Sequence, residues 1–164
     1  MWFSKRNRTS GSIRRAFAKF LPDEVARALE ENPESVSMPP LSREAVGYIL
    51  LQVRDDTTED ISRNIPLVLD LICDEGGMIE SILSSHVAAS FDHRSPISPE
   101  RMRALSAKLG PDVRSIYFFG ELLRGNFGSK RRLTYGTIVP DMGALFEELH
   151  QLEFGAAKES SQER

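Results

Sequence analysis

The sequence predicts an α+β fold in which helices pack on a largely antiparallel β-sheet. Short continuous apolar runs, typical of buried strands, alternate with longer segments whose apolar residues recur at helical spacing. Turn residues join neighbouring strand segments into two hairpins, which makes most of the strand pairing antiparallel. The resulting order is strand, helix, two strands, helix, two strands, helix, and this mixture is typical of a sheet covered by helices.

The first predicted strand and helix lie before residue 78. Residues 48–53 (YILLQV) form a short apolar run, as expected of a buried central strand. A helix is expected over 58–75, where Pro66 should kink or break it. The glycine pair at 76–77 ends this helix, because glycine tolerates the left-handed conformation of a helix end. Cys73 lies in the apolar part of the helix and is expected in the core.

The rest of the chain alternates in the same way. Ser98 followed by Pro99 indicates a helix start, since serine caps helices and proline suits their first position. The aromatic run 117–119 is expected mainly in the core, so nucleic-acid stacking is not expected. The predicted elements are a hairpin of strands 78–83 and 87–91, a helix over 98–109, a strand over 113–119, a hairpin of 122–123 and 133–139, and a helix over 140–154.

Length and composition indicate one domain with flanking segments. The chain has 164 residues, of which 40% are hydrophobic and 27% charged, as in ordinary globular proteins. The expected organisation is a basic flexible arm over 1–12, a helical lead-in over 13–32, a main domain over 41–154 and a disordered tail over 155–164. No apolar run approaches the ~20 residues of a membrane span, and the start of the chain lacks the apolar core of a signal peptide.

Charge is concentrated at the start of the chain. Residues 1–20 carry six basic residues and no acidic one, although the net charge of the whole chain is −3. Two interpretations stay open: weak contact of residues 1–20 with an anionic membrane, and a solvated lead-in. One cysteine excludes an internal disulfide framework and fits a reducing cytoplasm. The expected location is therefore cytoplasmic, with peripheral membrane contact as the alternative, and nucleic-acid binding is not expected.

Three segments carry a resemblance to a known family. Residues 125–135 read GNFGSKRRLTY, and they follow the glycine pair at 76–77 and the apolar run 48–53. In order and spacing these segments resemble the catalytic domain of class III adenylate and guanylate cyclases, over about residues 41–150. That family has a strand of the type FADI, a Gly-Gly hairpin and a later GN-x-GS segment followed by Arg and Tyr. The resemblance implies a ferredoxin-like core.

The resemblance also implies where metal ligands would lie. The family binds two metal ions through two aspartates, whose positions match Gln52 and Ser85 here. An amide and a hydroxyl are neutral, and neither balances the charge of a dication. Residues 45–54 contain no acid, and Glu80 is the only acid in 76–91. No metal site and no cofactor are therefore expected.

The remaining functional positions of the family are also changed. Its adenine-reading lysine matches Ser81, and the partner of that lysine matches Gly136. Its asparagine and arginine, which stabilise the transferred phosphate, match Gly143 and Glu147. Glu147 would repel a phosphate where the family supplies a donor. No catalytic residue is therefore expected.

These positions favour a catalytically inactive cyclase-like domain that acts in signalling by association. The expected partner is a second copy or a cyclase-like protein, paired head to tail as in the family. One alternative is an active cyclase that uses Asp55, Asp56 or Glu80 as substitute ligands. Another is a module that binds a nucleotide or anion without turnover, through the basic residues that flank the glycine-rich turn: Arg124, Lys130, Arg131 and Arg132.

Overall fold

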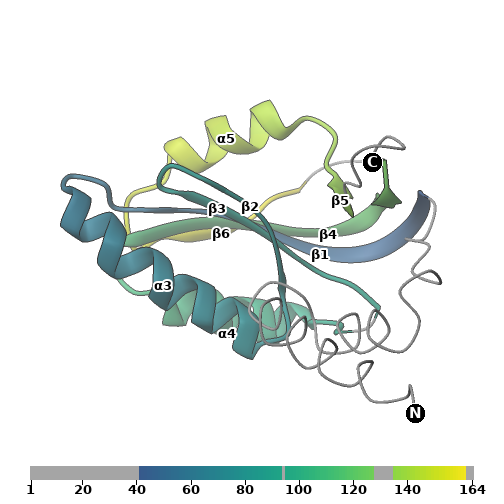
Figure 1. The fold of residues 1–164 in the computed structure, drawn as a ribbon, viewed down its shortest axis with the longest axis horizontal. Coiled ribbons are helices and arrows are strands. Elements are labelled where there is room, and N and C mark those ends of the chain that lie inside the picture. Colours follow the sequence, from purple (N-terminus) through teal and green to yellow (C-terminus); the bar gives the residue numbers. More distant parts are fainter. Residues whose placement is uncertain (1–40, 94, 128–134, 162–164) are drawn as a thin grey trace, which may run out of the picture. The chain divides into compact units, whose positions relative to one another are not determined.

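The computed structural model describes residues 41–93, 95–127 and 135–161. A six-stranded sheet runs in the order β2-β3-β1-β4-β5, and β6 also pairs with β4 (Figure 1). All described pairings are antiparallel except that of β6 with β4. The elements are β1 Ser42–Val53, α3 Thr58–Asp74, β2 Met78–Leu83, β3 His86–Phe91, α4 Pro99–Lys108, β4 Val113–Asn126, β5 Tyr135–Ile138, α5 Met142–His150 and β6 Ala157–Glu159.

Helices cover both faces of the sheet, as the α+β prediction required. Helices α3 and α4 lie on one face and α5 on the other (Figure 1). Side chains of β1 alternate between the two faces because successive residues of a strand point in opposite directions. Ile49 and Leu51 belong to the core cluster that includes residues of α3 and α4, whereas Leu50 packs in the cluster that includes Leu145 and Leu149 of α5. The predicted central strand is therefore confirmed.

Helix α3 is unbroken despite its proline. Its first turn is capped by Thr57, whose side-chain oxygen accepts a hydrogen bond from the backbone N–H of Asp60 at 3.1 Å. Pro66 lies on the exposed side of the helix, where water can replace the lost backbone bond. The helix continues through Pro66, so the break that the sequence offered as one outcome does not occur. The expected burial of Cys73 was wrong, because its neighbour Ile72 takes the core-facing position and the thiol is exposed.

A tight contact lies behind the glycine pair that ends α3. Gly76 has φ +83°, a conformation that glycine adopts without strain. A Cβ on Gly77 would lie 2.6 Å from Cγ2 of Ile72 and 2.7 Å from Cζ of Phe91. Both of these neighbours are buried in the core cluster under α3. The second glycine is therefore fixed by close packing of the β2 strand start against the helix.

Three strand boundaries differ from the sequence-based expectation. Strand β1 begins at Ser42 rather than at residue 48, because its polar first half pairs with β4. Strand β4 is one strand of 14 residues rather than two separate segments. Residues 157–159, expected to be disordered, form β6. The predicted arm over 1–12 and lead-in over 13–32 lie outside the described residues.

None of the described helices has the length and apolar composition needed to cross a membrane.

Candidate functional site

Three polar side chains form a row across the sheet at the end of β1. Gln52 is directly opposite His86 of β3 on one side and Arg114 of β4 on the other. Since Gln52 is two residues after Leu50, it lies on the face of the sheet covered by α5. Arg114 donates two hydrogen bonds to Oε1 of Gln52, from Nε at 2.9 Å and from Nη2 at 2.6 Å.

A chain of hydrogen bonds continues from Gln52 to an acid. Nε2 of Gln52 donates to Oγ of Ser85 at 3.3 Å, and the Ser85 hydroxyl donates to Oδ2 of Asp55 at 2.8 Å. Ser85 is fully buried and Gln52 nearly so. The structure thus brings together the two positions that match the metal-binding aspartates of the cyclases. It also places Asp55 beside them, although this residue follows the end of β1.

The guanidinium of Arg114 is fixed on its other side as well. Its Nη1 donates to the backbone carbonyls of His150, at 3.0 Å, and Leu152, at 2.8 Å. The guanidinium carbon lies 4.8 Å from the centre of the Phe154 ring, a distance typical of a cation–π contact. Four partners therefore hold one positive charge next to Gln52: its amide oxygen, which accepts two bonds, the two backbone carbonyls and the ring.

These residues do not fit a pair of divalent metal ions. Hard cations need several oxygen ligands with negative charge, and here Asp55 is the one carboxylate in the hydrogen-bonded chain. The amide oxygen of Gln52 already accepts two hydrogen bonds, and the Arg114 charge repels a cation. In the described ranges, one group of three potential ligands is close enough to share an ion, and it lies toward the start of β1: Glu44, Asp92 and His93.

The four other predicted positions lie apart from this row. Ser81 is exposed on β2, and the strand pairing shifts register between Ile79 and Ser81. Gly136 is buried on β5, where an added Cβ would lie 2.8 Å from Oε2 of Glu80. Gly143 and Glu147 are exposed on α5. The neighbour of Gly136 in space is therefore Glu80 rather than a group on Ser81.

Arg124 lies in the interior and not on an exposed basic turn, which corrects its proposed place in an anion site. Its side chain is 1% exposed and forms ion pairs with Glu80 at 3.5 Å and Asp92 at 3.3 Å. It also donates to the hydroxyls of Ser90 at 2.6 Å and Thr137 at 3.2 Å. This network joins β2, β3, β4 and β5. The other three members of the proposed anion site, Lys130, Arg131 and Arg132, lie outside the described residues.

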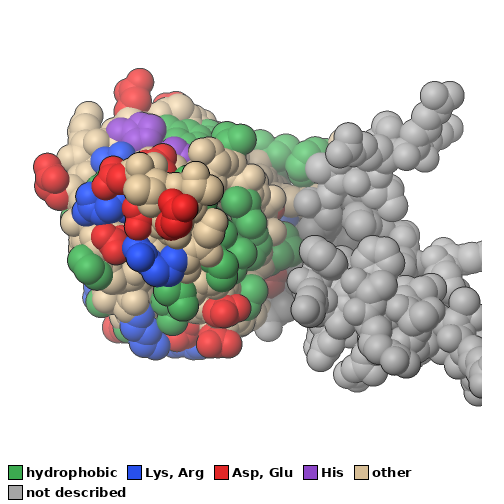
Figure 2. Space-filling view, turned by 60° about the vertical axis from the view of Figure 1, so that its left-hand side comes forward, with side chains coloured by type: hydrophobic (Ala, Val, Ile, Leu, Met, Phe, Trp, Pro, Cys, Tyr) green, Lys and Arg blue, Asp and Glu red, His purple; other side chains and the backbone are tan. Residues whose placement is uncertain are grey.

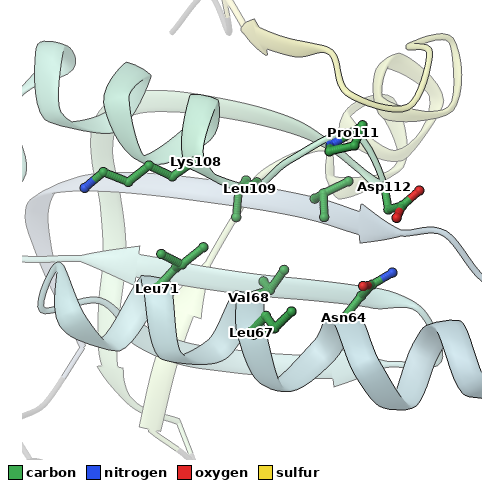
Figure 3. A pocket seen from close by; sticks show the side chains of 9 residues that line it. Asn64, Leu67, Val68, Leu71, Lys108, Leu109, Pro111 and Asp112 are labelled. Carbon is green, nitrogen blue, oxygen red and sulfur yellow. The ribbon is translucent and has the colours of Figure 1, made fainter.

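A separate pocket lies on the opposite face, between α3 and the end of α4 (Figure 3). Its volume is about 370 Å³, and Asn64 contributes an amide nitrogen that has no hydrogen-bond partner among the described residues. None of the six positions matched to the cyclase site lines this pocket. The lining residues are Asn64, Leu67, Val68, Leu71, Lys108, Leu109, Pro111, Asp112 and Val113.

Sequence reasoning missed Arg114 and Glu80. Strands around Gln52 and Arg114 were both predicted, but their register was not, so nothing indicated that the two side chains would be neighbours. Glu80 was considered only as a substitute metal ligand. The structure shows it instead as an acceptor for Ser90, for the Thr137 hydroxyl and for the backbone N–H of Thr137.

Comparisons with known proteins support one fold. No protein-family model matches the sequence, and no curated protein is significantly similar to it. The guanylyl cyclase Cya2 is 14% identical with a TM-score of 0.61, and the match covers 75% of this chain and 78% of that one. A bacterial light-regulated adenylyl cyclase is 16% identical with a TM-score of 0.64, covering 92% and 53%.

A third similar structure is a non-canonical dimeric guanylyl cyclase domain from the RhoGC fusion protein of the aquatic fungus Blastocladiella emersonii. It is 9% identical with a TM-score of 0.54, and the match covers 75% of this chain and 82% of that one. These identities are low, so the likeness concerns the fold. The described part of this chain has the fold of the class III adenylyl and guanylyl cyclase catalytic domains.

Proposed function

We propose that this cyclase-like domain is catalytically inactive and acts by associating with a second copy or with a cyclase-like partner. The observation that carries the proposal is the hydrogen-bonded chain from Arg114 through Gln52 and Ser85 to Asp55. At the positions that match the metal-binding aspartates of the cyclases, this chain has two neutral side chains, flanked by one fixed monovalent cation and a single carboxylate.

The charge of Arg114 and the shortage of carboxylates oppose metal binding beside Gln52 and Ser85. Two divalent ions would have to displace the Arg114 guanidinium, which four hydrogen bonds hold in position. The ions would gain one carboxylate, from Asp55, where two-metal phosphoryl chemistry requires a set of anionic ligands. On α5 the matched positions supply no donor for a phosphate, since Gly143 has no side chain and Glu147 is an acid.

We expect no cyclic AMP from ATP and no cyclic GMP from GTP when the whole chain is incubated with Mg²⁺ or Mn²⁺. The product should stay at the level of a blank without protein, while an adenylyl cyclase that has both aspartates forms product in the same assay. In parallel, Mn²⁺ binding is measured by water-proton relaxation. Wild-type protein should bind at least tenfold more weakly than a variant with Gln52→Asp, Ser85→Asp and Arg114→Ala.

Two variants distinguish inactivity from the use of substitute ligands. Asp55→Asn removes the acid at the end of the hydrogen-bonded chain, and Asp56→Asn removes its exposed neighbour as a matched control. Wild-type turnover that disappears in Asp55→Asn but persists in Asp56→Asn would refute the proposed inactivity. Nucleotide binding without metal and without turnover would favour an anion-binding module instead.

Association is supported by apolar side chains that remain exposed on neighbouring strands. Leu123 of β4 and Ile138 of β5 are directly opposite each other, and they are 39% and 40% exposed. Phe119 lies four residues before Leu123 on β4, on the same face of the sheet, and is 37% exposed. Clusters of exposed apolar residues commonly mark interaction surfaces. The dimeric RhoGC domain supports the same idea by its likeness in fold.

We expect the whole chain to form a dimer in sedimentation velocity, and the double variant Leu123→Glu with Ile138→Glu to weaken it at least tenfold. Charged residues on both strands would have to be desolvated in the interface. Leu67→Glu, on exposed α3, is the control and should leave the dimer unchanged. A wild-type chain that stays monomeric at high concentration, and also captures no cyclase-like protein, would contradict the association.

A further inference from the structure

Two histidines that are distant in the sequence are in contact at the surface. The inference drawn from them does not depend on the proposed function. His86 is the first residue of β3 and His150 the last residue of α5. Their Nε2 atoms are 3.1 Å apart, and their rings are inclined at 81°. Phe146 packs against the His86 ring with its centre 5.2 Å away. Figure 2 shows histidine side chains exposed together at the end of the molecule that this view brings forward.

We infer that His86 and His150 form a binding site for a transition-metal ion of the Zn²⁺ or Cu²⁺ type. Imidazole nitrogens bind such ions at about 2.0–2.1 Å. Two nitrogens 3.1 Å apart can both reach one ion at that length, with a nitrogen–metal–nitrogen angle of roughly 100°. That angle suits a tetrahedral or tetragonal ion, and water completes the coordination.

The surroundings prepare His86 for this role. Burial, and as a smaller cause the facing His150 ring, holds the pKa of His86 below its ordinary value. His86 also forms a hydrogen bond with the backbone of Leu83. Because Nε2 faces His150, we assign this bond to Nδ1, so Nε2 of His86 accepts the hydrogen bond from Nε2–H of His150, and a metal ion would replace that shared proton. Metal-binding histidines are commonly oriented in this way by a backbone carbonyl.

The nearby charges leave space for an ion, and the nitrogen ligands decide which type of ion binds. Asp55 raises the pKa of His86 and Arg114 lowers it, each by a smaller amount than burial does. The Arg114 charge is directed at Gln52 and at two backbone carbonyls, so it does not occupy the space between the imidazoles. Nitrogen ligands favour Zn²⁺ and Cu²⁺ over Mg²⁺. A bound ion would join the end of α5 to the start of β3.

Metal titration of the whole, tag-free chain tests this inference. Cys73→Ser is used as background because the Cys73 thiol is exposed and binds the same ions. Calorimetry with Zn²⁺ should show one equivalent bound, and His86→Asn and His150→Asn should each weaken binding at least tenfold. Electron paramagnetic resonance of bound Cu²⁺ should show two imidazole nitrogens in the background protein and one in each variant.

The third histidine of the chain provides the control. His93 belongs to the separate group with Glu44 and Asp92, and His93→Asn should leave Zn²⁺ binding unchanged. Loss of binding in His93→Asn, or unchanged binding when His86 and His150 are both replaced, would overturn the inference. Circular dichroism checks that each variant is folded. His150 is exposed at a helix end, so the His150→Asn variant should stay folded. Its Zn²⁺ affinity can therefore be measured even if replacement of His86 unfolds the protein.

Discussion

Replacing Arg124 with methionine should lower the free energy of unfolding by about 3–5 kcal/mol. The guanidinium lies between two carboxylates that are almost as buried as it is, Glu80 and Asp92. Methionine has a similar volume but no charge, so both acids would lose their ion pair in a place that water does not reach. Removing one partner of a buried ion pair leaves the other with its full desolvation cost.

Urea unfolding followed by circular dichroism measures this loss. The control is Arg63→Met, because Arg63 pairs with Asp60 at the exposed surface of α3, where such a pair contributes at most about 1 kcal/mol. Arg124→Lys keeps the charge but loses the planar set of donors, and it should fall between the two. Equal losses for Arg63→Met and Arg124→Met would show that the interior network contributes nothing special to stability.

Gly77→Ala should destabilise the domain by about 1–3 kcal/mol, the usual cost of forcing extra atoms into a packed core. The new methyl group would overlap the Ile72 side chain and the Phe91 ring. Both neighbours belong to the cluster beneath α3, so neither can move without opening a gap elsewhere. The start of β2 would have to shift away from the helix instead.

Gly143→Ala is the matched control for this substitution. Apart from its chain neighbours and the backbone of its own helix, its Cβ would meet no atom closer than Oδ1 of Asp141 at 3.8 Å, and the residue is in the first turn of α5. Alanine favours a helix over glycine by up to about 1 kcal/mol, so stability should stay the same or rise. Thermal melts of the two variants separate the effects. A melting temperature that falls equally in both would mean that the contact behind Gly77 is not the cause.

Local signals predicted the elements on which they act directly. Helix α3 ends one residue before the expected boundary, and the β2–β3 hairpin turns at Ser84, as its sequence indicated. Caps, proline positions and apolar spacing act within a few residues and can therefore be recognised in the sequence. The polar half of β1 and the whole of β6 were missed because partner strands, rather than local preference, hold them in place.

The candidate site shows the same limit more strongly. Gln52 and Ser85 could be singled out from the sequence by resemblance, and the structure does place them together. The bonds from Arg114 depend on the register of β4 against β1. A slip of one residue would turn the Arg114 side chain to the other face of the sheet. The contact of His86 with His150 depends on where α5 ends above the sheet. No local pattern contains that information.

Strand β6 protects an open side of the sheet. Beyond the short β5, the outer edge of β4 would present unpaired backbone groups at Ser115 and Tyr117. Residues just after α5 cover them: the N–H of Ser115 donates to the carbonyl of Ala156, and the N–H of Ser160 donates to the carbonyl of Tyr117. An uncovered edge is a template on which another chain can add a strand. Cutting the chain before residue 156 would therefore uncover this edge of β4 and favour aggregation, although every apolar core side chain would remain.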